Sequence, residues 1–133
     1  MSDGSGTHSD PILVVDDEAD LVATYERMLR RKGYRVISAG TRSAGLALVC
    51  REPLALLVTD IRLPDGDGLD LVRAVRRLPT PIPAIVATGL GSQASRTAAF
   101  AAGAAEYLAK PFAMSTFATL VQNALTTRAR EQP

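Results

Sequence analysis

The most constraining feature of the sequence is a short apolar run that ends on a carboxylate. Residues Leu56–Thr59 are followed by Asp60, and a loop with Pro64 and Gly68 comes next. An apolar run of this length, bounded by turn residues, is typical of a strand buried on both faces of a parallel sheet. Ligands bind at the carboxyl ends of such strands, and packing would favour another aliphatic side chain. We therefore predict that Asp60 has a chemical function.

A second apolar run, Ile12–Val15, also ends on acids. Asp16, Asp17 and Glu18 follow it directly. One acid at this point is explained by helix capping, because Asp accepts hydrogen bonds from the free amides of a helix N-terminus. Three adjacent acids repel one another unless a cation offsets their charge. The pattern therefore favours a cation site beside this strand, with capping as the alternative.

Strand-length and helix-length segments alternate along the whole chain. Strands are predicted at Ile12–Val15, Tyr34–Ala39, Leu56–Thr59, Ile82–Ala87 and Glu106–Ala109. Apolar residues at spacings of three and four predict helices over residues 19–32, 41–51, 69–78, 92–103 and 114–125. Parallel strands joined by helices require right-handed crossovers. The fold class is therefore predicted to be α/β, a doubly wound three-layer sandwich around a five-stranded parallel sheet.

Length and composition limit the possible functions. The chain of 133 residues fits one domain, and its net charge of +1 lacks the basic excess of a nucleic-acid binder. No apolar stretch approaches the roughly 20 residues of a membrane span, and the start lacks the apolar segment of a signal peptide. Cys50 is the single cysteine, which suits a reducing compartment. We expect a cytoplasmic protein without direct contact to nucleic acid or membrane.

The ordered domain is predicted to span residues 11–126. Residues 1–10 have little to bury and are expected to form a flexible tail, and residues 127–133 a polar C-terminal tail. The one histidine, His8, lies in the first tail and receives no role. Cys50 is expected to be a small buried residue of the second helix.

Two further strands are followed by polar residues that can reach the same edge of the sheet. Thr88 and Gly89 follow the fourth predicted strand, and Tyr107 lies in the fifth, just before Lys110 and Pro111. Singly, these are explained as a satisfied strand end, a core aromatic residue and a surface charge. Together they add a hydroxyl group and an ammonium group to the acids at one edge.

With these residues in place, the sequence resembles the receiver domain of bacterial two-component response regulators. The resemblance covers about residues 11–126 and rests on the acids after the first strand, on Asp60 with its Pro and Gly loop, and on Thr88, Tyr107 and Lys110. It implies a flavodoxin-like fold with strand order 2-1-3-4-5. Asp60 is then the expected phosphoacceptor, Thr88 and Lys110 are expected to contact the phosphoryl oxygens, and Tyr107 is the expected switch residue.

The resemblance also implies a metal site. Asp16, Asp17, Asp60 and the main-chain carbonyl of Arg62 are expected to bind Mg²⁺ or Mn²⁺, directly or through water. A hard divalent cation together with Lys110 offsets the charge of the phosphoryl oxygens, which is what phosphoryl transfer requires.

The implied function is that of a switch and not of a turnover enzyme. The domain is expected to catalyse its own phosphorylation and dephosphorylation through an acyl phosphate. A sensor histidine kinase or a histidine phosphotransfer protein is the expected phosphodonor, and an output domain or target protein is expected to receive the signal.

Two alternative functions remain. A degenerate receiver that serves only as a phosphorylation-independent interaction module is disfavoured, because no site residue is missing. A Mg²⁺-dependent phosphohydrolase with an aspartyl-phosphate intermediate, of the haloacid dehalogenase type, needs Asp-x-Asp after its first strand. Here Arg62 stands in place of the second acid, and the acceptor follows the third strand.

Overall fold

The structure is a computed structural model that describes residues 10–131, and side chains up to residue 128. Most of the predicted N-terminal tail, including His8, lies outside the described residues. The parallel strands are β1 (Ile12–Val15), β2 (Val36–Ala39), β3 (Leu56–Thr59), β6 (Ala84–Thr88) and β7 (Glu106–Ala109). They pair in the order β2-β1-β3-β6-β7, which confirms the predicted sheet and its strand order.

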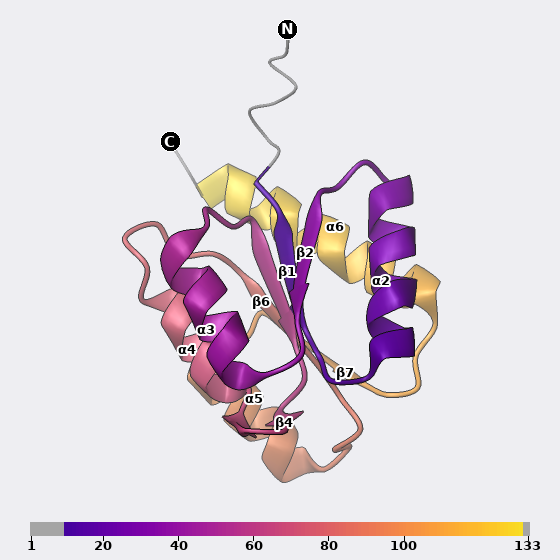
Figure 1. The fold of residues 1–133 in the computed structure, drawn as a ribbon, viewed down its shortest axis with the longest axis vertical. Coiled ribbons are helices and arrows are strands. Elements are labelled where there is room, and N and C mark those ends of the chain that lie inside the picture. Colours follow the sequence, from indigo (N-terminus) through magenta and orange to yellow (C-terminus); the bar gives the residue numbers. More distant parts are fainter. Residues whose placement is uncertain (1–9, 132–133) are drawn as a thin grey trace, which may run out of the picture.

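Helices cover both faces of this sheet, as the α/β prediction requires. They are α2 (Ala19–Arg31), α3 (Arg42–Arg51), α4 (Leu69–Arg76), α5 (Gln93–Ala102) and α6 (Met114–Glu131). Figure 1 shows α3, α4 and α5 on one side of the sheet and α2 and α6 on the other. No helix of the described chain is long and apolar enough to span a membrane.

Two separate apolar cores explain why the central strands show no polar alternation. In β1, Leu13 and Val15 belong to the core beneath α3, α4 and α5, whereas Ile12 and Val14 belong to the core beneath α2 and α6. All four side chains are at most 1% exposed. Successive side chains of a strand point to opposite faces, so a strand covered on both faces is apolar throughout.

Several details differ from the sequence prediction. A two-stranded antiparallel sheet, β4 (Arg62–Leu63) with β5 (Gly66–Asp67), forms in the loop after Asp60. Helix α6 continues to Glu131, beyond the predicted domain end at residue 126. Strand β6 begins at Ala84 instead of Ile82, and Ile82 donates its amide to the main-chain oxygen of Val75.

The predicted burial of Cys50 is wrong, because Cys50 is exposed. Helix α3 instead buries Gly45 and Val49, which lie one turn apart. A β-carbon built on Gly45 would lie 3.1 Å from Val15 and 3.2 Å from Leu71. Gly45 therefore allows α3 to pack closely on the core, and this turns Cys50 toward solvent.

The carboxylate of Asp65 joins the loop after Asp60 to the start of α3. It accepts hydrogen bonds from the main-chain amides of Arg42 (2.6 Å) and Ser43 (2.9 Å). These bonds, from Ser43 and Arg42, lower the pKa of Asp65 below its ordinary value of 3.8. The Arg42 side chain donates in turn to Asp70 of α4 at 2.8 Å. The loop is thereby attached to two helices.

We predict that Asp65→Asn lowers the melting temperature at pH 7, because the neutral amide is a weaker acceptor for free helix amides. A group whose pKa is lowered by folding stabilises the protein above its unfolded pKa and loses that effect as the pH falls. The melting temperatures of the two proteins should therefore converge below about pH 4. Thermal denaturation between pH 3 and 8 tests this.

Asp20→Asn is the matched control, since Asp20 also lies at the start of a helix but its carboxylate makes no hydrogen bond within the described structure. It should change the melting temperature less. An equal loss in both variants, or a loss in Asp65→Asn that does not depend on pH, would contradict the capping role.

Candidate functional site

Three carboxylates and one ammonium group meet at the carboxyl edge of the sheet. The Nζ atom of Lys110 donates to Asp16 (2.8 Å), Glu18 (2.7 Å) and Asp60 (2.8 Å). The side chains of Lys110, Asp16 and Asp60 are 15%, 2% and 11% exposed, whereas that of Glu18 is exposed. The structure thus brings the predicted Asp16, Asp60 and Lys110 into direct contact.

Strand register places the two buried acids side by side. Val15 of β1 pairs with Thr59 of β3, so the next residues, Asp16 and Asp60, leave the sheet at the same level. The amide of Asp60 donates to the main-chain oxygen of Val15 at 3.1 Å. The paired ends of these two strands therefore bring two acids that are distant in the sequence into one site.

The backbone after Asp60 turns so closely that only glycine fits at position 68. A β-carbon on Gly68 would overlap the main-chain oxygen of Asp60 and lie 2.9 Å from the hydroxyl oxygen of Thr59. The amide of Gly68 donates to Ile61 at 2.7 Å, which closes the turn. The glycine predicted as a turn residue is thus required by the close approach of two backbone segments.

Burial and pairing set the charges of the site. Burial raises the pKa of Asp16, although hydrogen bonds from Lys110 and Glu18 oppose this effect. Burial alone would lower the pKa of Lys110, but hydrogen bonds to Asp16, Asp60 and Glu18 outweigh it and raise that pKa. Lys110 is therefore positively charged at neutral pH and offsets the negative charge around it.

The acidic group has the composition of a hard-metal site. Oxygen atoms of Asp16, Glu18 and Asp60 lie within 4.8 Å of one another. Oxygen ligands of this kind suit Mg²⁺ and Mn²⁺. The group contains Glu18 in place of the predicted Asp17, which is exposed. The run of three acids in the sequence indicated that another acid was available, but not which one turns toward Asp60. The ligand role of Asp17 and of the Arg62 carbonyl stays a prediction.

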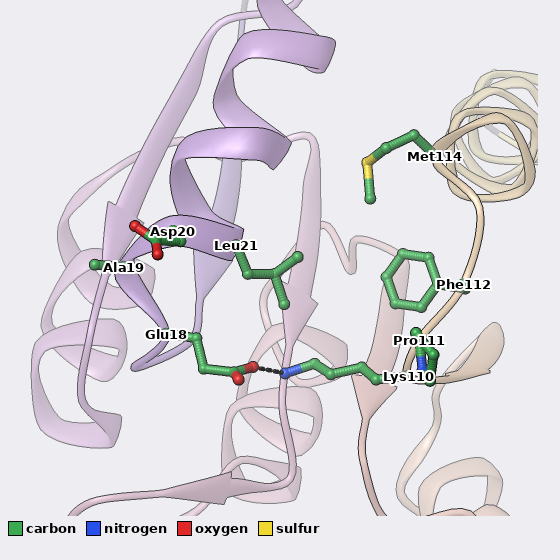
Figure 2. A pocket seen from close by; sticks show the side chains of 8 residues that line it. All are labelled: Glu18, Ala19, Asp20, Leu21, Lys110, Pro111, Phe112 and Met114. Atoms are coloured by element: carbon green, nitrogen blue, oxygen red, sulfur yellow. Dashed lines mark hydrogen bonds and ion pairs between the residues drawn. The ribbon is translucent and has the colours of Figure 1, made fainter.

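A pocket opens beside Lys110, between the start of α2 and the segment after β7 (Figure 2). Glu18 and Leu21 lie on the α2 side of the pocket, and the apolar side chains of Phe112 and Met114 lie on the other side. The pocket therefore exposes Glu18 and Lys110 to solvent along a partly apolar wall.

Thr88 and Tyr107 are joined through one residue, Leu90. Thr88 is 1% exposed at the end of β6, and its hydroxyl oxygen accepts from the Leu90 amide at 3.2 Å. The Tyr107 hydroxyl donates to the main-chain oxygen of Leu90. The amide of Lys110 donates to the main-chain oxygen of Thr88 at 2.8 Å. The structure therefore connects Thr88, Tyr107 and Lys110, as their shared place on two neighbouring strands predicted.

Solved structures of receiver domains share this fold. A CheY-like response regulator receiver domain from Methanospirillum hungatei has a TM-score of 0.88 and 29% identity, covering 93% of this chain and 99% of that one. A response regulator from Burkholderia pseudomallei, solved with a phosphorylated aspartic acid, a calcium ion and citrate, has a TM-score of 0.77 and 33% identity. That match covers 92% of this chain and 73% of the other.

Sequence comparisons reach the same family. The photosynthetic apparatus regulatory protein RegA of Rhodovulum sulfidophilum is 37% identical over 100 residues, 75% of this chain and 55% of RegA. The response regulator protein PilR of Pseudomonas aeruginosa is 38% identical over 116 residues, 87% of this chain and 26% of PilR. The chain thus spans about half of RegA and a quarter of PilR. The sequence profile of the response regulator receiver domain matches residues 12–122, and the chain belongs to that family.

Proposed function

We propose that this receiver domain accepts a phosphoryl group on Asp60 in a reaction that depends on Mg²⁺ or Mn²⁺. The observation that carries the proposal is the position of Asp60 at the end of the central strand β3, paired with Lys110 beside Asp16 and Glu18. The phosphorylated aspartic acid in the Burkholderia pseudomallei relative supports the same chemistry here.

In the proposed reaction a carboxylate oxygen of Asp60 attacks the phosphorus atom of the donor. An oxygen–phosphorus bond forms, the bond from phosphorus to the donor breaks, and an acyl phosphate results. Lys110 would then pair with a phosphoryl oxygen as well as with the acids it holds. Attack of water on the acyl phosphate would release inorganic phosphate and restore Asp60. The domain would therefore act on itself, as a switch and not as a turnover enzyme.

The proposed ligands of the cation are Asp16, Asp17, Asp60 and the main-chain carbonyl of Arg62. When bound, a divalent cation supplies positive charge for the oxygens of the transferred group. Asp16 and Asp60 lie in the acidic group, whose all-oxygen composition fits such an ion.

The proposed donor is a sensor histidine kinase or a histidine phosphotransfer protein, and the proposed receiver of the signal is an output domain or a target protein. The relatives are themselves named as regulatory proteins and are longer than this chain. We place the reaction in the cytoplasm and without direct contact to nucleic acid, as expected from the cysteine content and the charge.

We predict that acetyl phosphate with Mg²⁺ adds one phosphoryl group to the wild-type protein and none to Asp60→Asn. Intact-protein mass spectrometry measures this. Asp67→Asn is the matched control, because Asp67 lies in the same loop and accepts from the Leu69 amide outside the acidic group. Equal labelling of wild type and Asp60→Asn would exclude Asp60 as the acceptor, and an unlabelled wild type would favour the degenerate receiver. Steady turnover of small phosphoesters would favour the phosphohydrolase.

A second prediction tests the metal ligands. Asp17→Asn should weaken Mg²⁺ binding by about tenfold or more, measured by calorimetric titration. The melting temperature without Mg²⁺ should stay the same or rise, because the variant relieves clustered negative charge. Within the described structure the Asp17 carboxylate accepts no hydrogen bond, so a capping role would not be lost.

Glu18→Gln is the comparison for this test, since Glu18 lies in the acidic group and Asp17 does not. Weaker binding in Glu18→Gln, with no effect of Asp17→Asn, would assign the ligand role to Glu18. A large loss of metal-free stability in Asp17→Asn would instead favour the capping alternative.

The proposed switch begins at Thr88. Movement of its hydroxyl toward a phosphoryl group would displace Leu90, to which Tyr107 is bonded. Conversion of a mostly inactive population into a mostly active one requires about 5.5 kcal/mol of differential binding. A charge-assisted bond from Lys110, about 1.5 to 3 kcal/mol, together with a bond from Thr88 is of that order.

We therefore predict that Thr88→Ala still accepts the phosphoryl group but loses most of the response at Tyr107. The measurement is the change in NMR chemical shifts around Tyr107 on addition of beryllofluoride, a phosphoryl mimic, with Mg²⁺. Thr88→Ser keeps the hydroxyl and should keep the response. An unchanged response in Thr88→Ala would mean that the signal leaves the site by another route.

A further inference from the structure

The ring of Tyr107 has a second partner besides Leu90. The guanidinium carbon of Arg96, on α5, lies 5.7 Å from the centre of the Tyr107 ring and 5.2 Å from that of Phe100. Both distances are within the range of cation–π attraction, about 6 Å. We propose that Arg96 is a positioning residue that holds the Tyr107 ring where its hydroxyl bonds Leu90, and thereby sets the resting state of the switch. This inference rests on the switch role proposed for Tyr107.

The two aromatic rings are the partners that the structure provides for Arg96. Arg96 and Phe100 lie one turn apart on α5, where side chains four residues apart are neighbours. Within the described residues Arg96 forms no ion pair with a carboxylate. Phe100 is 40% exposed, a large apolar side chain that the core does not bury. Its exposed position is explained if the ring serves as a platform for Arg96.

The bond to Leu90 would not by itself fix the ring. Leu90 lies in the loop between β6 and α5, with Gly89 on one side and Gly91 on the other. A β-carbon built on either glycine would meet no atom within 4 Å, so nothing packs at the side-chain positions of these two glycines. Glycine also leaves the backbone more conformational freedom than other residues. Arg96 lies on a regular helix, so its contact gives the ring a second support outside this loop.

Rotation of Tyr107 away from its present position must break the contact with Arg96. The contact therefore adds to the difference in free energy between the two ring positions. At an exposed site, loss of one cation–π contact should change the ratio of the two positions by about two- to fivefold. Arg96 would thus set how readily movement of Thr88 rotates Tyr107 and so changes the surface beside α5.

The test uses the full chain without phosphodonor or metal. NMR cross-relaxation between the Tyr107 ring protons and Leu90 is compared in wild type, Arg96→Gln, Arg96→Lys and Arg77→Gln. Arg77 is the matched control, because it is an exposed arginine at the end of α4 without an aromatic partner or an ion pair within the described residues. Melting temperatures of all four proteins show whether each variant is folded.

We expect the Leu90-bonded position of Tyr107 to become about two- to fivefold less populated in Arg96→Gln. It should recover in part in Arg96→Lys, which keeps the cation, and remain as in wild type in Arg77→Gln. Unchanged cross-relaxation in Arg96→Gln, or the same change in Arg77→Gln, would overturn the proposal.

The outcome is separable from that of the proposed function. A shift of Tyr107 in Arg96→Gln supports the positioning role even if mass spectrometry finds no phosphorylation of Asp60. Phosphorylation of Asp60 with no effect of Arg96→Gln on Tyr107 supports the proposed function and rejects the positioning role.

Discussion

The rest of the site depends on the ion pairs that the ammonium group of Lys110 makes. It pairs with Asp16 and Asp60, which leave neighbouring strands, and with Glu18. Both aspartates lie against a core of aliphatic side chains, where unpaired charges of like sign are costly. One partly buried cation therefore makes the acidic edge compatible with the apolar sheet, and its raised pKa keeps it charged. The same cation lies beside the oxygen atoms that we propose react.

The site is a consequence of strand register. Asp16 and Asp60 are far apart in the sequence, yet both follow strands of equal length that pair residue for residue. The turn behind Asp60 requires Gly68, and the loop that follows is attached to α3 through Asp65. Pairing with β1 and the turn closed by Gly68 thus fix the backbone before and after the proposed acceptor. A flexible loop would not hold a nucleophile in so well defined a position.

Several details could not be predicted because they depend on contacts and not on periodicity. Helix α3 is rich in alanine and leucine, so its pattern does not select one face, and close packing at Gly45 turns Cys50 outward. Strands β4 and β5 have two residues each, too few for any pattern. Helix α6 continues beyond the last residues of its apolar face, because backbone hydrogen bonds and good helix formers can extend a helix into solvent.

The sequence by itself determined the fold class and the strand order implied by the family resemblance, and it named Asp16, Asp60, Thr88, Tyr107 and Lys110 as candidates for the site. It could do so because the central buried strands show as continuous apolar runs, and because polar residues at or near the carboxyl ends of several parallel strands meet at one edge of the sheet. Only the tertiary structure decided that Glu18 joins Lys110 and that Arg96 contacts Tyr107. Both depend on side-chain direction and on distances across elements, which residue spacing along one chain does not specify.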